Sequence, residues 1–193
     1  MREKEKEMRQ TRTINSEFKT RSEGNELRIE GYFAVFNSNY QITDDMSESI
    51  EQGAFSETLG DDIRALIDHE TMYVLGRNKA GTLELREDSH GLWGSILVNP
   101  NDQDAMNVYA RVERGDVNQC SIGFDILEEE TEFRGKETHW TIKRVKLYEV
   151  SVCTFPAYAE TSVQAREHDR ETIVKRESEK WKNEMMNKLK GVK

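Results

Sequence analysis

Alternating polar and non-polar residues predict a core rich in β-strands. From Leu27 to Val35 every second residue is non-polar, which is the pattern of a strand with one buried face. The run Ile63–Ile67 predicts a short strand that leads to His69. Further strands are expected as a hairpin over 83–98, over 120–127 and over 140–155. The last of these is apolar on both faces near its middle, so we expect it in the interior of a sheet or barrel.

The clearest helix signal in this core follows Asn99 and Pro100. Asn99 suits an N-cap and Pro100 suits the first helical position. Apolar residues then recur at helical spacing up to Gly115, which is expected to end the helix. One or two helical turns are also expected over Gly53–Leu59, and a charged turn over Glu128–Glu137. Strands outnumber helices, so the predicted fold class is α+β and β-dominated.

Composition indicates that the two ends of the chain lie outside this core. Only 35% of the 193 residues are hydrophobic, against about 45–50% in ordinary soluble domains, and 34% are charged. We therefore predict a charged, mostly disordered arm over 1–25, one folded domain over 26–166, and a charged, amphipathic helical tail over 167–193. The apolar stripe of the tail is narrow, which favours either a surface helix or a segment that docks on a partner helix.

Charge and hydropathy exclude several classes of partner. A formal net charge of −9, with basic residues scattered among acidic ones, argues against nucleic-acid binding. No apolar run is long enough for a membrane span, and the opening MREKEKEMRQTR lacks the apolar centre of a secretory signal. We therefore expect a cytosol-like compartment, in which the two cysteines, Cys120 and Cys153, remain thiols.

One of the four histidines, His69, has surroundings that suggest chemistry. It ends an apolar strand between two carboxylates that can raise its proton affinity and orient its ring, Asp68 and Glu70. The other three are expected to be solvated or hydrogen-bonded side chains: His90, His139 and His168. A metal site is a weaker alternative, because the spacing of its candidate ligands matches no motif such as HExxH. Those ligands would be Asp68, His69, Glu70, Asp88 and His90. The sequence predicts neither a metal nor another cofactor.

Ser121 and Glu149 complete a possible set for acyl transfer. Ser121 lies on the strand face opposite the bulky residues, and Gly123 leaves room above it for a substrate backbone. Cys120 is a competing nucleophile, but its alternation points it into the core. Glu149 falls on a buried face, where an ionised carboxylate needs a hydrogen-bonding partner. Histidine, serine and carboxylate supply the base, the nucleophile and the orienting group of a serine hydrolase.

The order of several short motifs resembles one protein family. The series is GYFAVFNS (31–38), GAF (53–55), DHE (68–70), LGR (75–77), GTLEL (81–85), EDSHGLWGSI (87–96), SIGF (121–124) and LYEVSVCTFPAY (147–158). This series resembles the tailed-phage prohead maturation proteases, which are serine peptidases similar in fold to the herpesvirus capsid protease, assemblin. The resemblance covers about residues 26–166.

The resemblance implies a closed, mostly antiparallel β-barrel flanked by helices, with the histidine and the serine on neighbouring strands. His69 matches the family histidine, although Glu70 replaces the aspartate that usually follows it. Ser121 matches the serine of the motif that ends in Gly-Phe. Assemblin has a second histidine as its third member, whereas this chain presents Glu149 at the analogous place. The expected catalytic set is therefore Ser121, His69 and Glu149.

The resemblance also implies a function in capsid maturation. The expected substrates are scaffold or delta-domain segments, the N-terminal region of the major capsid protein, and the protease itself. The reaction would take place inside a procapsid in the host cytoplasm, with no nucleic-acid or membrane partner. Assemblin-like enzymes suggest a homodimer. The segment after about Arg166 is expected to tether the protease to scaffold or capsid protein and to be removed by self-cleavage. Residues 154–158 are candidates for an oxyanion-hole donor.

Two other functions remain open at this point. One is a catalytically inactive capsid assembly factor with the same fold. The other is an unrelated cytosolic β-rich binding module in which the serine and the histidine are structural. A fluorophosphonate probe that labels Ser121 would separate both from a protease.

Overall fold

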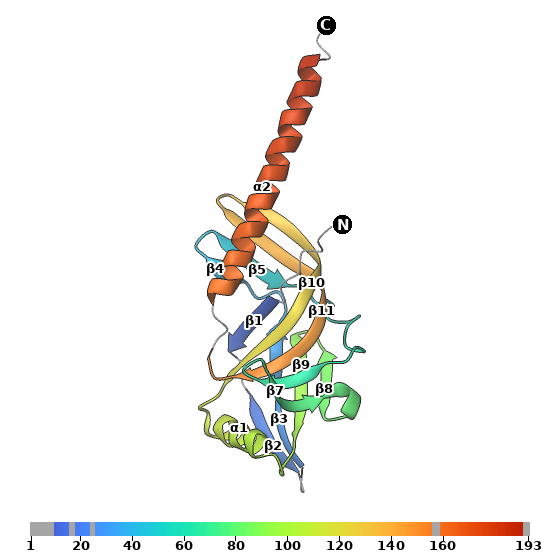
Figure 1. The fold of residues 1–193 in the computed structure, drawn as a ribbon, viewed down its shortest axis with the longest axis vertical. Coiled ribbons are helices and arrows are strands. Elements are labelled where there is room, and N and C mark those ends of the chain that lie inside the picture. The colour runs from blue at the N-terminus through green and yellow to red at the C-terminus, as the bar shows by residue number, and fades with distance from the viewer. Residues whose placement is uncertain (1–9, 16–17, 24–25, 156–158, 191–193) are drawn as a thin grey trace.

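The computed structural model describes residues 10–15, 18–23, 26–155 and 159–190, and most of these lie in strands (Figure 1). The strands are β1 (Gln10–Asn15), β2 (Lys19–Glu23), β3 (Glu26–Val35), β4 (Tyr40–Thr43), β5 (Met46–Ile50), β6 (Arg64–Ile67), β7 (Glu70–Arg77), β8 (Leu83–Glu87), β9 (Gly91–Val98), β10 (Gln119–Arg134) and β11 (Glu137–Cys153). The helices are α1 (Gln103–Arg114), α2 (Ala159–Lys190) and a 3₁₀ turn over Asn78–Ala80. The predicted β-dominated class is confirmed.

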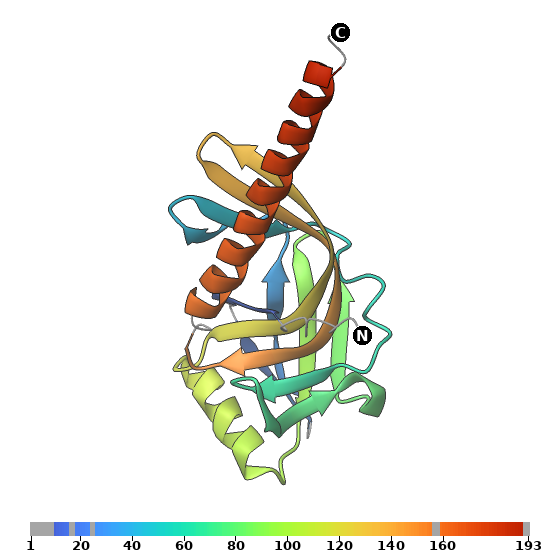
Figure 2. The same ribbon diagram turned by 45° about the horizontal axis from the view of Figure 1, so that its top comes forward.

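The described strands form two sheets. The larger follows the order β1-β10-β11-β5-β4, and β6 joins it between β11 and β7. The smaller follows the order β2-β3-β9-β8. Among the described strands, β11 is parallel to β5 and to β6, and the other pairs are antiparallel. Figure 2 shows how β10 and β11 curl around the smaller sheet as a half-barrel. Within the described residues of the larger sheet, β1, β4 and β7 are edge strands. The closed barrel therefore stays a prediction.

The hydrophobic core lies between the curled β10–β11 pair and the smaller sheet. β11 pairs with β10 on one side and with β5 and β6 on the other, which confirms that this strand lies in the interior of its sheet. Side chains from both sheets are fully buried together, including Phe33, Ile96, Ile122 and Val150. Helix α1 adds its apolar face to the same cluster through Val108 and Val112. Burial of this apolar surface is the main favourable term in folding.

Helix α1 starts later than its sequence predicts. Asp102 is the N-cap, and its carboxylate accepts hydrogen bonds from the backbone N–H groups of Asp104 and Ala105. Asn99 instead accepts from the backbone N–H of Asn101 in the turn that precedes the helix. Gly115 ends the helix as predicted, with a φ of 86° that favours glycine. The segment from residue 53 to 59 forms successive turns rather than a helix.

The prediction of a charged turn over 128–137 is wrong, because β10 and β11 continue through it. Only Gly135 and Lys136 separate the two strands. This end of the hairpin extends beyond the core, so most of its β10 side chains are exposed and charged residues pair across the strands. Glu130, for example, pairs with Lys143 at 2.5 Å. The charges therefore mark an exposed ribbon and not a loop.

The prediction of a mostly disordered arm over 1–25 is also wrong for the part that the structure describes. Strand β1 pairs with β10, and β2 pairs with β3. One polar side chain of β1 has a partner that is distant in sequence: Arg12 forms a buried ion pair with Glu48. Residues 1–9 lie outside the described residues.

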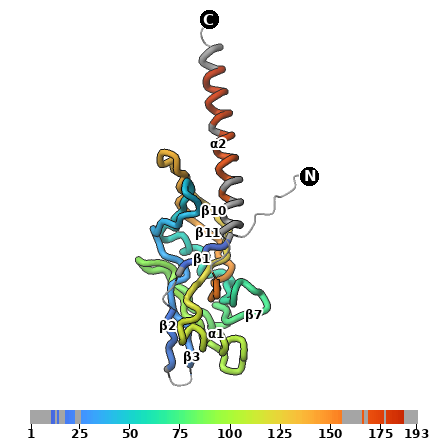
Figure 3. Tube along the Cα trace, turned by 90° about the vertical axis from the view of Figure 1, so that its left-hand side faces the viewer, coloured from blue at the N-terminus to red at the C-terminus, as the bar shows by residue number. Residues whose placement is uncertain are grey.

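Helix α2 begins before the predicted tail and then leaves the domain. Near its start, Arg166 is completely buried against Glu48 and the ring of Trp140. Farther along, the side chains of the helix are mostly exposed, and Trp181 is 60% exposed. Figure 3 shows this part of α2 extending away from the strands. Neither described helix is long and apolar enough to cross a membrane.

Candidate active site

A tight turn between β6 and β7 carries His69. Strand β6 ends at Ile67, and Asp68 and His69 are the two residues of the turn before Glu70 starts β7. Both have positive φ angles, 48° and 63°, as a type I′ hairpin turn requires. Non-glycine residues seldom adopt this conformation, so it persists only where the surroundings hold it.

Strand β11 and the residue that follows it supply this support. The backbone N–H of Asp68 donates to the carbonyl of Val152 at 3.1 Å. The Asp68 carboxylate accepts from the backbone N–H and the hydroxyl of Thr154, at 2.8 and 3.2 Å. The turn therefore fixes the position of His69 relative to β11.

Glu149 on β11 holds the ring of His69. The Nδ1 atom of His69 lies 2.7 Å from Oε1 of Glu149, whose residue is only 4% exposed. The second carboxylate oxygen, Oε2, accepts a hydrogen bond from the Ser151 hydroxyl at 2.6 Å. Ser151 Oγ also accepts from the backbone N–H of His69 at 3.3 Å. The buried carboxylate thus has the partner that its burial predicted, and it orients the imidazole.

Gly123 provides the space that Glu149 occupies. The two residues face each other across the β10–β11 ladder. A Cβ atom at position 123 would lie 2.2 Å from Oε1 of Glu149, which is closer than any allowed contact. The expectation that Gly123 makes room for a substrate backbone is therefore corrected: the room is filled by the carboxylate.

Ser121 lies on the same face of the sheet as His69, but its hydroxyl is not hydrogen-bonded to the imidazole. It faces Ser151 across the ladder, so its side chain points to the side that carries Glu149 and His69. Ser121 is fully buried, and its hydroxyl donates to the carbonyl of Arg12 on β1 at 2.9 Å. The Nε2 atom of His69 is buried and has no hydrogen-bond partner within the described part of the chain. Of the predicted set, His69 and Glu149 are hydrogen-bonded to each other, whereas the Ser121 hydroxyl is directed toward β1.

One residue of this site, Ser151, was not predicted from the sequence, and two others, Asp68 and Glu70, have roles that differ from the predicted ones. Ser151 binds both Glu149 and the backbone of His69, and its only sequence signal was its position two residues beyond Glu149 on a strand. The carboxylates beside His69 do not orient its ring. Asp68 binds Thr154 instead, and Glu70 is exposed.

The two cysteines are not alternative nucleophiles in this structure. Cys120 is buried in the core and its thiol lies 3.1 Å from the carbonyl of Tyr32, as its alternation predicted. Burial, together with the negative charges of Asp68 and Glu149, raises the pKa of the Cys153 thiol to about 12. Cys153 is therefore protonated near neutral pH, and a protonated thiol is a poor nucleophile.

The remaining candidates take structural positions. Asp88 accepts a hydrogen bond from the Tyr32 hydroxyl, and the ring of His90 packs edge-on against Tyr32. His139 is buried between the hydroxyls of Ser47 and Ser49, and burial lowers its pKa. No group of three or more His, Cys, Asp or Glu side chains within the described ranges is arranged to hold a metal. The side chain of His168 and residues 156–158, part of the oxyanion candidate, lie outside the described residues. The Thr154 N–H already donates to Asp68.

Comparisons with known proteins identify the family of this chain. The sequence profile of the caudovirus prohead serine proteases matches residues 16–176. The prohead protease of Enterobacteria phage HK97 is 30% identical over 154 residues, which are 78% of this chain and 64% of that protein. The chain thus spans less than two thirds of this relative. Among solved structures, the bacteriophage T4 capsid assembly protease is similar with a TM-score of 0.50 and 11% identity, over 77% of this chain and 98% of that one. At that identity the likeness concerns the fold alone.

Proposed function

This chain belongs to the caudovirus prohead serine proteases, and we propose that it is a serine endopeptidase of capsid maturation. In this proposal Ser121 is the nucleophile, His69 the general base and Glu149 the carboxylate that orients the base. The observation that carries it is the His69–Glu149 hydrogen bond at Nδ1, which leaves Nε2 as the acceptor on the face of the sheet where Ser121 lies.

The proposed chemistry requires the Ser121 hydroxyl to change its hydrogen-bond partner. The Ser121 hydroxyl must turn from the Arg12 carbonyl toward Nε2 of His69. His69 then takes the hydroxyl proton as Oγ attacks a peptide carbonyl, and Glu149 stabilises the imidazolium that forms. Protonated His69 next donates to the leaving amine, and water hydrolyses the acyl-enzyme by the same steps.

The proposed setting is the inside of a procapsid in the host cell. The name of the relative that is 30% identical, a prohead protease, supports this setting. We propose that the substrates are scaffold or delta-domain segments, the major capsid protein and the chain itself. Confinement at high local concentration would let a weakly binding enzyme act. The same proposal includes a catalytic domain that spans about residues 26–166. It also includes assembly as a homodimer and closure of the sheets into an assemblin-like barrel.

The exposed part of α2 is the segment that we propose is removed by self-cleavage. Beyond Arg166, which is anchored in the domain, most described side chains of the helix are exposed. A protease can cut an exposed helix only after local unfolding, and a helix without packing partners unfolds readily.

Intact mass of the purified chain tests the proposal. The unmodified chain should shorten with time, and Ser121→Ala or His69→Ala should stay at full length, because loss of either residue lowers the rate by about 10⁶-fold. Addition of capsid and scaffold proteins to the same samples tests cleavage in trans. Identical lengths for all three proteins, together with intact capsid and scaffold proteins, would contradict the proposal and favour the inactive assembly factor.

A further inference from the structure

Strand β1 lies along the edge of β10 that carries Ser121. Thr13 faces Ser121 in the antiparallel ladder, and β1 is the edge strand of its sheet. The carbonyl of Arg12 accepts the hydrogen bond from the Ser121 hydroxyl. Ser121 is fully buried in this arrangement. A peptide cannot pair with this side of β10 while β1 is in place.

The same edge has the geometry that an extended peptide needs. Strand addition gives a bound peptide a ladder of main-chain hydrogen bonds, with pockets on either side for alternate side chains. β1 already forms such a ladder over its six residues, from Gln10 opposite Phe124 to Asn15 opposite Gln119. Any extended chain that replaced β1 in this register would run past the nucleophile of the proposed protease.

We infer that the β10 edge is the substrate-binding strand and that β1 is a segment of the chain itself that occupies it, an inference that rests on the proposed function. A substrate then binds as an extended strand in the place of β1. Binding requires β1 to leave β10, so the structure described here is a closed state of the site.

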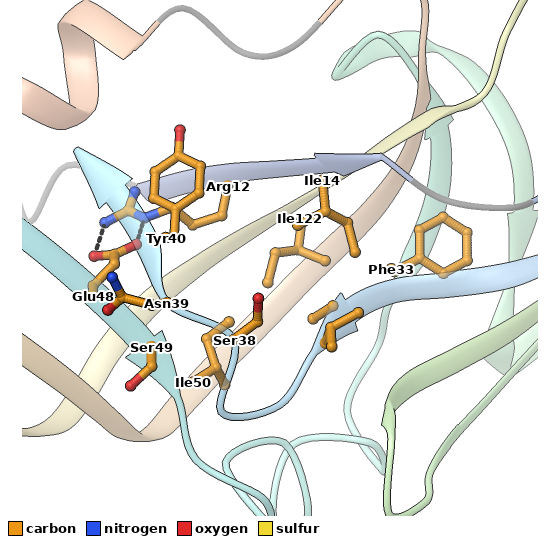
Figure 4. A pocket seen from close by; sticks show the side chains of 12 residues that line it. Arg12, Ile14, Phe33, Ser38, Asn39, Tyr40, Glu48, Ser49, Ile50 and Ile122 are labelled. Atoms are coloured by element: carbon orange, nitrogen blue, oxygen red, sulfur yellow. Dashed lines mark hydrogen bonds and ion pairs between the residues drawn. The ribbon is translucent and has the colours of Figure 1, made fainter. Parts of the chain in front are cut away.

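A buried charge cluster holds β1 in place at some distance from Ser121. Arg12 donates through Nε and Nη2 to both oxygens of Glu48 on β5, and Figure 4 shows this fork at one end of a pocket. Arg166 of α2 binds the same carboxylate at 3.0 Å. The three residues are at most 5% exposed. A substitution that weakens the contact between the Arg12 side chain and Glu48 should therefore loosen β1 and leave the side chains of Ser121, His69 and Glu149 unchanged.

Ile14 offers a way to lock β1 reversibly. It lies directly opposite Cys120 in the β1–β10 ladder, and both side chains point toward the core. Opposite residues of an antiparallel pair have Cβ atoms about 4.5–5.5 Å apart, close to the span of a disulfide. In the variant Ile14→Cys, oxidation should bridge β1 to β10, and reduction should release it. Cys153 is not expected to form a disulfide under these conditions, because burial raises the pKa of its thiol and keeps it protonated.

The test measures fluorophosphonate labelling of Ser121 in the full-length Ile14→Cys variant, with bridge formation confirmed by intact mass. Labelling should be at least about tenfold slower in the bridged protein than after reduction, because the bridge removes the open state. The matched control carries Ile14→Cys with Cys120→Ala, which cannot form the bridge and should label equally under both conditions. Arg12→Gln in the natural background should label faster than the unmodified chain.

The outcomes separate this inference from the proposed function. Equal labelling of the bridged and reduced proteins would overturn the inference, because Ser121 would then be reached with β1 in place, and it would leave the protease proposal intact. No labelling of Ser121 in any protein, the reduced variant and the natural chain included, would overturn the proposed function and the inference with it.

Discussion

Two buried glutamates of the larger sheet, Glu149 on β11 and Glu48 on β5, have different partners. Glu149 binds an imidazole and a hydroxyl, and the far nitrogen of that imidazole has no hydrogen-bond partner in the described structure. Glu48 binds two guanidinium groups, from Arg12 and Arg166. Burial alone raises the pKa of Glu48, but the two arginines outweigh it and hold that pKa below its usual value.

Burial of a carboxylate therefore does not by itself mark an active site. Arginine stays charged near neutral pH and the pKa of Glu48 is lowered, so the Glu48 cluster does not exchange protons there and is suited to joining parts of the chain. It joins β1, β5 and α2. Imidazole can take up and release a proton near neutral pH, so the Glu149 pair is suited to catalysis. Four substitutions test this comparison.

Of these four, Glu149→Gln should have the largest effect on the reaction. An amide in place of the carboxylate no longer fixes the imidazole tautomer or stabilises the imidazolium, and comparable changes cost about 10⁴-fold in turnover. The rate of self-processing by intact mass measures this loss, and thermal unfolding checks the fold. Full activity of the variant would remove Glu149 from the catalytic set.

Glu48→Gln should act on stability instead. It removes the buried carboxylate that Arg12 and Arg166 share, and although Arg166 keeps its contacts with Glu129 and Asp169, the loss should lower the free energy of unfolding by up to about 3–5 kcal/mol. Urea unfolding at pH 7 measures the change. Glu130→Gln, which removes an exposed pair with Lys143, is the matched control and should change stability little. Equal stability of both variants would show that the buried cluster does not hold β1 and α2 against β5.

Gly123→Ala should have a smaller effect on activity than the loss of the carboxylate. The added methyl group occupies the position of the Glu149 carboxylate and displaces it from His69, and a misplacement of about 1 Å costs about 10²-fold. Gly60→Ala is the control, because a Cβ atom there meets nothing within 4 Å. If the two variants were equally active in a peptide-cleavage assay, the space at Gly123 would have another purpose.

Ser151→Ala should have the smallest effect, a loss of about tenfold in turnover. It removes one hydrogen bond to the carboxylate, and such bonds to charged groups contribute about 1.5–3 kcal/mol. The buried Ser95, which binds Glu30 in the other sheet, gives the control variant Ser95→Ala. Because Ser151 acts through Glu149, its loss should add little in the Glu149→Gln background. A fully additive double variant would contradict this role.

The parts of the site that follow from local pattern could be predicted from the sequence. Alternation on β11 indicates that Glu149 is buried, and the apolar run of β6 indicates that His69 follows the end of a strand. These signals need only the neighbours along the chain. The same holds for Cys120, whose alternation points it into the core as observed.

The parts that depend on distant partners could not be predicted. The polar sequence of β1 is typical of a disordered arm, and its order depends on partners that are distant in sequence: the ladder with β10 and the contact of Arg12 with Glu48, 36 residues away. The role of Gly123 depends on a carboxylate from the facing strand. The charged residues of 128–137 suggested a turn because sequence pattern does not distinguish a loop from a hairpin that extends beyond the core.

We propose that His69, oriented by Glu149, activates Ser121. The decisive test is to map a fluorophosphonate adduct by peptide mass spectrometry. We expect an adduct on Ser121 in the natural chain and its loss in a folded His69→Ala variant. An adduct on Ser151 or another hydroxyl, or equal labelling of Ser121 without the imidazole, would contradict it.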